Sequence, residues 1–367
     1  MTSTSSTDAD RALRRCRVGL PAADGRSDRV GEIYVMLTWR CNLRCRMCPM
    51  WGEHGFCVDD GAGEETLSPE AVVEFLRGAA ELRPRTVTIS GGEPLLSESC
   101  LPLARSLREI GLKVMLTTNA TLLADVAPAD LAWFRQINVS IDGPPLVLER
   151  MNRGGSATMD RALEGLAQVR RIDGTPPALQ LLTVITGEGV GHLIDMLDLF
   201  EREGVAFSRY LFQHQMFLSP EAAAAHHAAL ERLLGPGVDI WSAMVSGVGS
   251  VDVDVLIDEM NAIRRKIPGA LFSPDLDEQE LRRYYAEGSW LPPRLSQFCP
   301  SPWLDVGIAP DGAVWLCPGF PVGNLHEGTF EDAFNGPQAR RLRRTIAQQG
   351  LFPGCRGCFY LYNYQAP

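Results

Sequence analysis

The chain has 367 residues, of which 45% are hydrophobic and 22% are charged, so it is long enough for one large or two medium-sized packed domains. Its net charge of −10 argues against nucleic acid or an anionic membrane as a partner, since both attract basic surfaces. No apolar stretch reaches the length of a membrane-spanning helix, which argues against a membrane protein.

The first 31 residues are polar and contain no apolar segment of the kind found in signal peptides. We expect a flexible tail over residues 1–31 and a cytoplasmic protein. Cysteines in that compartment are thiols or metal ligands before they are disulfides. The ten cysteines of the chain are therefore candidates for metal binding.

Short apolar runs alternate with amphipathic stretches between residues 33 and 212. The apolar runs are nearly continuous, which is typical of parallel strands covered on both faces. Six β–α repeats predict an α/β fold, a partial (β/α)6 barrel similar to a TIM barrel, with its site at the carboxyl ends of the strands. The expected strands are 33–38, 86–90, 113–118, 137–141, 179–185 and 207–212, and the expected helices are 68–82, 97–110, 120–134, 158–172 and 190–203.

The character of the sequence changes after the sixth expected strand. Residues 216–295 predict a less regular, helical connector between a barrel over 32–215 and a small C-terminal domain over 296–367. That domain contains two expected strands around the hairpin-turn signal Pro310-Asp311-Gly312. A helix is expected after them, over 330–347.

Three cysteines follow the first expected strand with the spacing C-x3-C-x2-C, at Cys41, Cys45 and Cys48. A closed zinc site normally has four protein ligands, so His54 or Cys57 would have to supply the fourth. Three thiolates also suit a 4Fe–4S cube, which leaves one iron with an open position. The residues by themselves leave both interpretations open.

Polar or glycine-rich motifs end the next three expected strands. They are SGGEP at 90–94, TTN at 117–119 and SIDG at 140–143, and RMNRG follows at 150–154. Glycines let a backbone approach a ligand closely, and a carboxylate such as that of Glu93 can meet an ammonium group. Each motif could alone be a turn or a helix cap, but their joint position at consecutive strand ends predicts a ligand site.

This order of motifs, together with the cysteine spacing, resembles the radical S-adenosylmethionine (SAM) superfamily. The resemblance implies a 4Fe–4S cluster on Cys41, Cys45 and Cys48 whose open iron is bound by the amino and carboxylate groups of SAM. In place of the aromatic residue that the family often has near adenine, this chain has Met47. The residues implied to contact SAM are Met47, Gly91, Gly92, Glu93, Pro94, Thr118, Asn119, Ser140 and Asp142.

Four further cysteines lie near the C-terminus, at Cys299, Cys317, Cys355 and Cys358. Four thiolates with one C-x2-C pair complete either a zinc or an iron–sulfur site. The start of the set, C-x12-G-x4-C, resembles the SPASM extension of radical SAM enzymes in its shortened form, called twitch. The resemblance implies a second, auxiliary 4Fe–4S cluster with four protein ligands, and zinc is the alternative.

The resemblance also implies a reaction. A flavodoxin or ferredoxin reduces the first cluster, SAM is cleaved, and a 5′-deoxyadenosyl radical takes a hydrogen atom from the substrate. We expect a radical SAM oxidoreductase, or a lyase or epimerase, that remodels a small polar metabolite such as a sugar, aminocyclitol or nucleoside in natural-product biosynthesis. The expectation is based on the few residues before the first strand, too few for a domain that binds a leader peptide. One alternative is a maturase of a ribosomally made peptide, by epimerisation or cross-linking; another is a non-catalytic iron–sulfur or zinc module.

Several loop residues near the expected mouth of the barrel have candidate roles. Cys57 could donate a hydrogen atom to a substrate radical, or could be an ordinary buried thiol. Glu53, His54, Gln213 and His214 could contact substrate or accept a proton, or be solvated or core residues.

Overall fold

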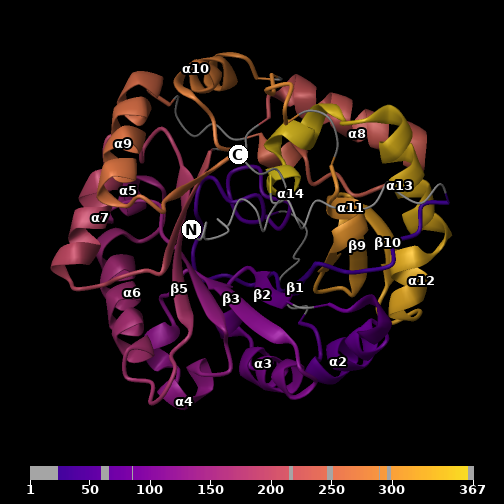
Figure 1. Cartoon of the computed structure of the whole chain (residues 1–367), viewed down its shortest axis with the longest axis horizontal. Coiled ribbons are helices and arrows are strands. Elements are labelled where there is room, and N and C mark those ends of the chain that lie inside the picture. The colour runs from indigo at the N-terminus through magenta and orange to yellow at the C-terminus, as the bar shows by residue number, and fades with distance from the viewer. Residues whose placement is uncertain are drawn as a thin grey trace, which may run out of the picture.

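The computed structural model describes residues 24–58, 66–84, 86–214, 218–245, 251–288, 290–295 and 299–362. The strands of these segments form one sheet in the order β10-β9-β8-β1-β2-β3-β4-β5-β6-β7. The sheet curls into an incomplete barrel with helices around its outside (Figure 1). The predicted fold class, a partial barrel of the TIM type, is confirmed.

The six predicted barrel strands are confirmed to within two residues at each end. Neighbouring strands from β1 to β6 all pair in parallel, so their carboxyl ends meet at one rim. The strands are β1 Glu32–Thr38, β2 Thr86–Gly91, β3 Lys113–Thr118, β4 Gln136–Ser140, β5 Ala178–Ile185 and β6 Arg209–His214.

Alternate side chains of the strands point outward to the helices or inward to the barrel interior. On β1, Ile33, Val35 and Leu37 are completely buried beneath the surrounding helices. The intervening side chains, such as Tyr34 and Met36, therefore face the interior, because successive residues of a strand point to opposite faces. The helices of this part are α2 Pro69–Arg77, α3 Cys100–Glu109, α4 Pro128–Leu131, α5 Pro145–Arg150, α6 Gly155–Val169 and α7 Leu193–Arg202.

The helix predicted over 120–134 is wrong. The structure has only a 3-10 turn, η3 Leu123–Asp125, and the four-residue α4 in this segment. Pro128 has no backbone N–H to donate, so it can begin α4 but cannot lie inside a longer helix. The predicted helix over 68–82 likewise ends at Arg77, followed by a 3-10 turn, η1 Ala80–Leu82.

The predicted connector contains a strand that the sequence analysis missed. β7 pairs in parallel with β6 and extends the sheet. Three residues are too few to show the alternation by which a strand is recognised. The elements of this region are α8 Pro220–Leu234, η4 Ser242–Met244, α9 Val253–Lys266, β7 Leu271–Ser273 and α10 Glu278–Ala286.

The C-terminal part joins the same sheet, because β8 pairs in parallel with β1. The predicted hairpin is confirmed as β8 and β9, which are antiparallel. The helix predicted over 330–347 is broken before Pro337, which starts a new helix. The elements are α11 Ser301–Leu304, β8 Asp305–Ile308, β9 Ala313–Cys317, β10 Phe320–Asn324, α12 Phe330–Asn335, α13 Pro337–Gln349, η5 Pro353–Gly357 and α14 Phe359–Tyr362. The domain boundaries near 215 and 296 remain a prediction.

The end of the predicted N-terminal tail is packed rather than free. The Ser27 backbone N–H donates to Asn335 Oδ1 at 2.9 Å, and Arg343 Nη1 donates to the Gly25 carbonyl at 3.1 Å. Residues 1–23 of that tail, Cys16 among them, lie outside the described residues. In the parts of the chain that the structure describes, no helix has the length and hydropathy to cross a membrane.

Candidate functional site

The loop after β1 brings its three cysteines together. Burial raises the pKa of the Cys45 thiol to about 12, and the neighbouring Cys48 and Cys41 add to the rise. Burial also raises the pKa of Cys41 and of Cys48, while the nearby Arg153 guanidinium acts in the opposite direction on all three. Thiols this close ionise together only beside positive charge, which a metal centre supplies. The donor set therefore fits an iron–sulfur cluster.

The SGGEP motif after β2 packs directly against the start of the cysteine loop. The Gly92 N–H donates to the Thr38 carbonyl and the Glu93 N–H donates to the Arg40 carbonyl, both at 2.8 Å. A Cβ on Gly92 would lie 2.1 Å from the Arg40 carbonyl oxygen, which no backbone could accommodate without moving. The glycine is thus required by a close contact between two backbone segments.

Gly92→Ala is expected to displace the cysteine loop and to weaken SAM binding at least tenfold. The clash involves backbone atoms on both sides, so no side-chain rotation relieves it. Equilibrium titration of the reconstituted protein with SAM measures the effect. Gly269→Ala is the matched control, since a Cβ there meets no atom within 4 Å. Equal SAM affinity in the two variants would contradict the prediction.

Glu93 lies at the centre of a buried network that joins the ends of β2 and β3. Its Oε1 accepts from Thr118 Oγ1 at 2.8 Å and from the Leu95 N–H at 3.2 Å. Its Oε2 accepts from the Asn119 N–H at 2.8 Å. Burial raises the pKa of Glu93 to about 7, against the effect of these three donors. Both oxygens are engaged within the protein, so the contact with SAM predicted for this side chain stays a prediction.

The same network reaches the cysteine loop through Asn119. Its side-chain amide donates to Asn42 Oδ1 at 2.9 Å, and Asn42 donates to Thr121 Oγ1 at 2.8 Å. Asn42 directly follows the first of the three cysteines. The TTN motif thereby fixes the loop that carries the thiols.

A buried ion pair lies on the other side of the thiols, between Asp142 at the end of β4 and Arg153. Arg153 Nη1 donates to Asp142 Oδ2, and its Nη2 donates to the Ser140 carbonyl at 2.7 Å. Asp142 Oδ1 accepts from the Val184 N–H at 2.8 Å. Burial by itself would lower the pKa of Arg153, but Asp142, Cys45 and Cys48 outweigh it and raise that pKa.

Arg153 was missed as a site residue by the sequence analysis, although it belongs to the RMNRG motif. The signal was the arginine next to a glycine after the fourth strand. The rest of the motif holds the cysteine loop: the Arg46 N–H donates to the Met151 carbonyl at 3.0 Å, and Asn152 Nδ2 donates to the Arg44 carbonyl at 2.8 Å. Met47 packs against Met151 and Val147.

The structure places the remaining candidates in different surroundings. Cys57 is 1% exposed and lies in an apolar cluster with Trp39 and Ala309. His214 points away from the barrel interior into the core, where its Nδ1 lies 2.9 Å from the Tyr285 hydroxyl and burial lowers its pKa to about 3. Gln213, beside it on β6, has the opposite orientation. Glu53 lines a surface cleft with the side chains of the cysteine loop, and His54 is exposed.

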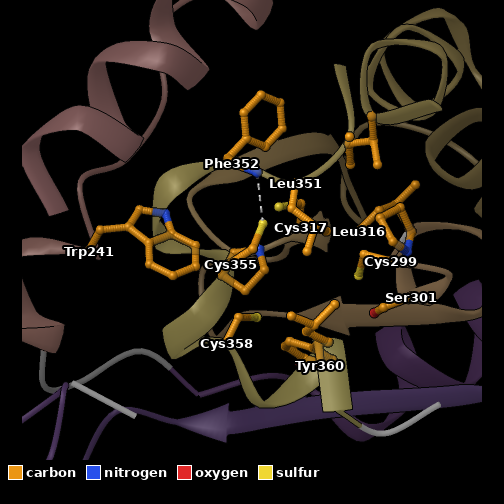
Figure 2. A pocket seen from close by; sticks show the side chains of 15 residues that line it. Trp241, Cys299, Ser301, Leu316, Cys317, Leu351, Phe352, Cys355, Cys358 and Tyr360 are labelled. Atoms are coloured by element: carbon orange, nitrogen blue, oxygen red, sulfur yellow. Dashed lines mark hydrogen bonds between the residues drawn. The ribbon is translucent and has the colours of Figure 1, made fainter. Parts of the chain in front are cut away.

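The four C-terminal cysteines line one cavity, as Figure 2 shows. Cys299 precedes α11, Cys317 ends β9, Cys355 lies in η5 and Cys358 follows it. Burial raises the pKa of all four, to about 11 for Cys355 and about 12 for Cys358, and the nearby Cys355 adds to the rise at Cys299, Cys317 and Cys358. The Phe352 N–H donates to Cys355 Sγ at 3.3 Å. The four thiols line one cavity, and one of them accepts a backbone N–H···S hydrogen bond. Both features suit a second metal–sulfur centre.

Across the described segments, no group of three or more His, Cys, Asp or Glu side chains is arranged to hold a single metal ion. The zinc alternative for each cysteine set stays a prediction.

Two family models match the chain. Residues 35–200 match the radical SAM superfamily, and residues 299–359 match SPASM, an iron–sulfur cluster-binding domain. The two matches cover the barrel with its cysteine loop and the four-cysteine cavity.

Several relatives in sequence are GTP 3′,8-cyclases. That of Peptoclostridium acidaminophilum is 32% identical over 169 residues, which are 45% of this chain and 49% of the relative. That of Parasynechococcus marenigrum is 34% identical over 203 residues, 50% of this chain and 56% of the relative. The chain thus spans about half the length of the curated relatives it matches.

Solved structures show the likeness in fold. Streptococcus suis SuiB bound to the precursor peptide SuiA has a TM-score of 0.59 at 13% identity, over 92% of this chain and 70% of SuiB. The protein anSMEcpe with bound AdoMet and Cp18Cys peptide has a TM-score of 0.51 at 14% identity, over 84% of this chain and 81% of its own. Membership of the superfamily implies a 4Fe–4S cluster and SAM as cofactors, and the SPASM domain implies auxiliary iron–sulfur binding. With its two matched domains and this barrel, the chain belongs to the radical SAM superfamily and carries a C-terminal SPASM domain.

Proposed function

We propose that this radical SAM enzyme oxidises or dehydrates a small polar metabolite of the sugar, aminocyclitol or nucleoside class. The observation that carries the proposal is the convergence of Cys41, Cys45 and Cys48 on the rim where β2, β3 and β4 end. The hydrogen-bonding side chains of the barrel interior support the substrate class.

Each group of residues has a distinct task in this proposal. Cys41, Cys45 and Cys48 would hold the first cluster, and the buried Arg153 would place a positive charge beside it. Glu93 and Asp142 would keep the strand ends in position, while Gly91, Gly92, Pro94, Thr118, Asn119, Ser140 and Met47 would form the walls against SAM. When bound, the cluster and SAM supply a 5′-deoxyadenosyl radical that can take a hydrogen atom from carbon. The barrel orients the substrate and excludes water from it.

Polar side chains face the barrel interior from several strands. Near the start of β1, Glu32 accepts from the Tyr34 hydroxyl at 3.0 Å and from Thr88 Oγ1 at 2.7 Å. On β3 and β4, Asn138 Nδ2 donates to Thr117 Oγ1 at 3.1 Å. Such groups can exchange these bonds for bonds to hydroxyl or amino groups of a ligand. An interior of this kind favours a small substrate rich in hydrogen-bonding groups.

The sequence relatives point to the same class of substrate. Their name, GTP 3′,8-cyclase, states that they act on a nucleotide, which is itself a small polar metabolite. The structural neighbours that bind peptides share 13–14% identity with this chain, so their peptide binding carries less weight here than the sequence relatives do.

The reaction type is inferred from the second cysteine set. A substrate radical that becomes oxidised must give up one electron, and a cluster on Cys299, Cys317, Cys355 and Cys358 could accept it. Epimerisation instead requires a hydrogen donor, and Cys57 is enclosed by apolar side chains. We therefore favour oxidation over epimerisation assisted by Cys57; dehydration involves no net loss of electrons and does not need this acceptor.

Deuterium transfer tests the substrate class. Cells are grown in deuterated water, and their extract is divided into a small-molecule fraction and a peptide fraction. Each fraction is added to the reconstituted protein with SAM and a chemical reductant. Deuterium is expected in 5′-deoxyadenosine only with the small-molecule fraction, since the radical takes its hydrogen from the substrate. Mass spectrometry of 5′-deoxyadenosine measures it.

The Cys41→Ala, Cys45→Ala, Cys48→Ala variant provides the background for that assay. Transfer from the peptide fraction alone would contradict the metabolite proposal and indicate a peptide maturase. No SAM cleavage with either fraction or with reductant alone would indicate a non-catalytic module.

A further inference from the structure

Trp241 forms one wall of the four-cysteine cavity, although it comes from the segment between α8 and η4. The side chain is 1% exposed, and it lies in Figure 2 beside Cys355. Its indole nitrogen, Nε1, is buried and has no hydrogen-bond partner within the protein. A buried N–H without an acceptor costs about 1–3 kcal/mol, so an acceptor is expected at this position.

The indole nitrogen lies close to Gly319, between β9 and β10. A Cβ on Gly319 would lie 3.0 Å from Trp241 Nε1, so a larger residue would crowd the indole. The Gly319 carbonyl is already an acceptor for the Val238 N–H at 2.9 Å. Gly319 follows Cys317 by two residues, so the indole nitrogen lies beside the segment that carries one of the four thiols.

His226 of α8 fixes the indole in place. Its ring centroid is 4.0 Å from that of Trp241, with 54° between the planes. His226 Nδ1 accepts from the Gly354 N–H at 2.8 Å, which ties the same imidazole to the loop that carries Cys355. The wall and the C-x2-C loop are therefore held as one unit, and the imidazole nitrogen bonded to Gly354 carries no proton.

We propose that the Trp241 indole N–H donates a hydrogen bond to a sulfur of the auxiliary cluster and raises its reduction potential. The inference rests on the proposed cluster at Cys299, Cys317, Cys355 and Cys358. The four cysteine sulfurs, and the sulfides of a bound cluster, are the acceptors expected in this cavity. Hydrogen bonds to sulfur are among the factors that set the reduction potential of a cluster. A donor stabilises the reduced, more negative cluster more than the oxidised one. Trp241 would thereby favour electron transfer into this site.

The experiment uses the full chain with Cys41, Cys45 and Cys48 replaced by Ala, so that only the auxiliary cluster remains. In this background, Trp241→Phe keeps an aromatic ring beside His226 and removes the N–H together with the second ring of the indole. Unchanged iron content and a reduction potential shifted to more negative values are expected, measured by redox titration with electron paramagnetic resonance. Trp315→Phe is the matched control: it removes an equally buried, unpartnered indole N–H on β9 from a side chain that does not line the cavity, and the potential should not move.

A second measurement detects the hydrogen bond directly. With ¹⁵N in the tryptophan indoles, the reduced cluster should show a magnetic coupling to one nitrogen, and Trp241→Phe should remove it. An intact cluster whose potential is equal in both tryptophan variants, or one without the nitrogen coupling, would overturn the inference. A parent chain that holds zinc or no metal would overturn the cluster assignment itself, and the inference with it.

Discussion

Replacing Cys41, Cys45 and Cys48 together with Ala is expected to lower the iron content of the anaerobically reconstituted protein from about eight to about four atoms per chain, the content of two and of one 4Fe–4S cluster. Reductive cleavage of SAM should be abolished. The three thiols of the loop after β1 are the ligands predicted for the first cluster, and no other described cysteine shares that loop except the enclosed Cys57. The four C-terminal thiols lie in a separate cavity and should keep their cluster.

Iron analysis and detection of 5′-deoxyadenosine measure the two effects. Cys100→Ala is the matched control, since Cys100 is a buried thiol at the start of α3 and its loss should leave both quantities unchanged. Retention of about eight iron atoms in the triple variant would sink the assignment of the first cluster to this loop.

The barrel strands could be predicted because each is a nearly continuous apolar run between two turn signals. Strands that lack such an apolar run could not be predicted from the sequence. The three-residue β7 shows no alternation, and its pairing with β6 is a contact across the intervening helices α8 and α9. The segment 120–134 is apolar enough for a helix, but Pro128 and the Asn119 network decide its course.

In the site, too, local features could be predicted from the sequence and contacts between distant residues could not. The spacing of Cys41, Cys45 and Cys48 is local, so the sequence carries it completely. The partner of Asp142 is not local: Arg153 reaches it only because α5 and the following turn reverse the chain. For that reason the sequence could not show that the carboxylates of Glu93 and Asp142 are hydrogen-bonded within the protein, and their predicted contacts with SAM stay predictions.

Asp142→Leu is expected to destabilise the protein by about 3–5 kcal/mol, because it leaves the buried Arg153 charge without its partner. Asp142 is completely buried and Arg153 is 3% exposed, so solvent cannot replace the lost carboxylate. SAM affinity should fall as well, since the guanidinium is no longer held beside Cys45 and Cys48. Urea unfolding under reducing conditions and SAM titration measure the two effects. Arg161→Met, which breaks largely exposed pairs with Asp125 and Glu164, should cost no more than about 1 kcal/mol.

A double variant separates the structural from the functional part of this pair. Asp142→Leu with Arg153→Met replaces both charges by apolar groups, which often restores stability, because neither buried charge then lacks a partner. We expect the unfolding midpoint to recover most of its loss while SAM binding stays weak, because the positive charge beside the thiols is gone. Recovery of SAM affinity together with stability would mean that the pair only holds β4 and the RMNRG segment together, and that the charge of Arg153 has no part in cofactor binding.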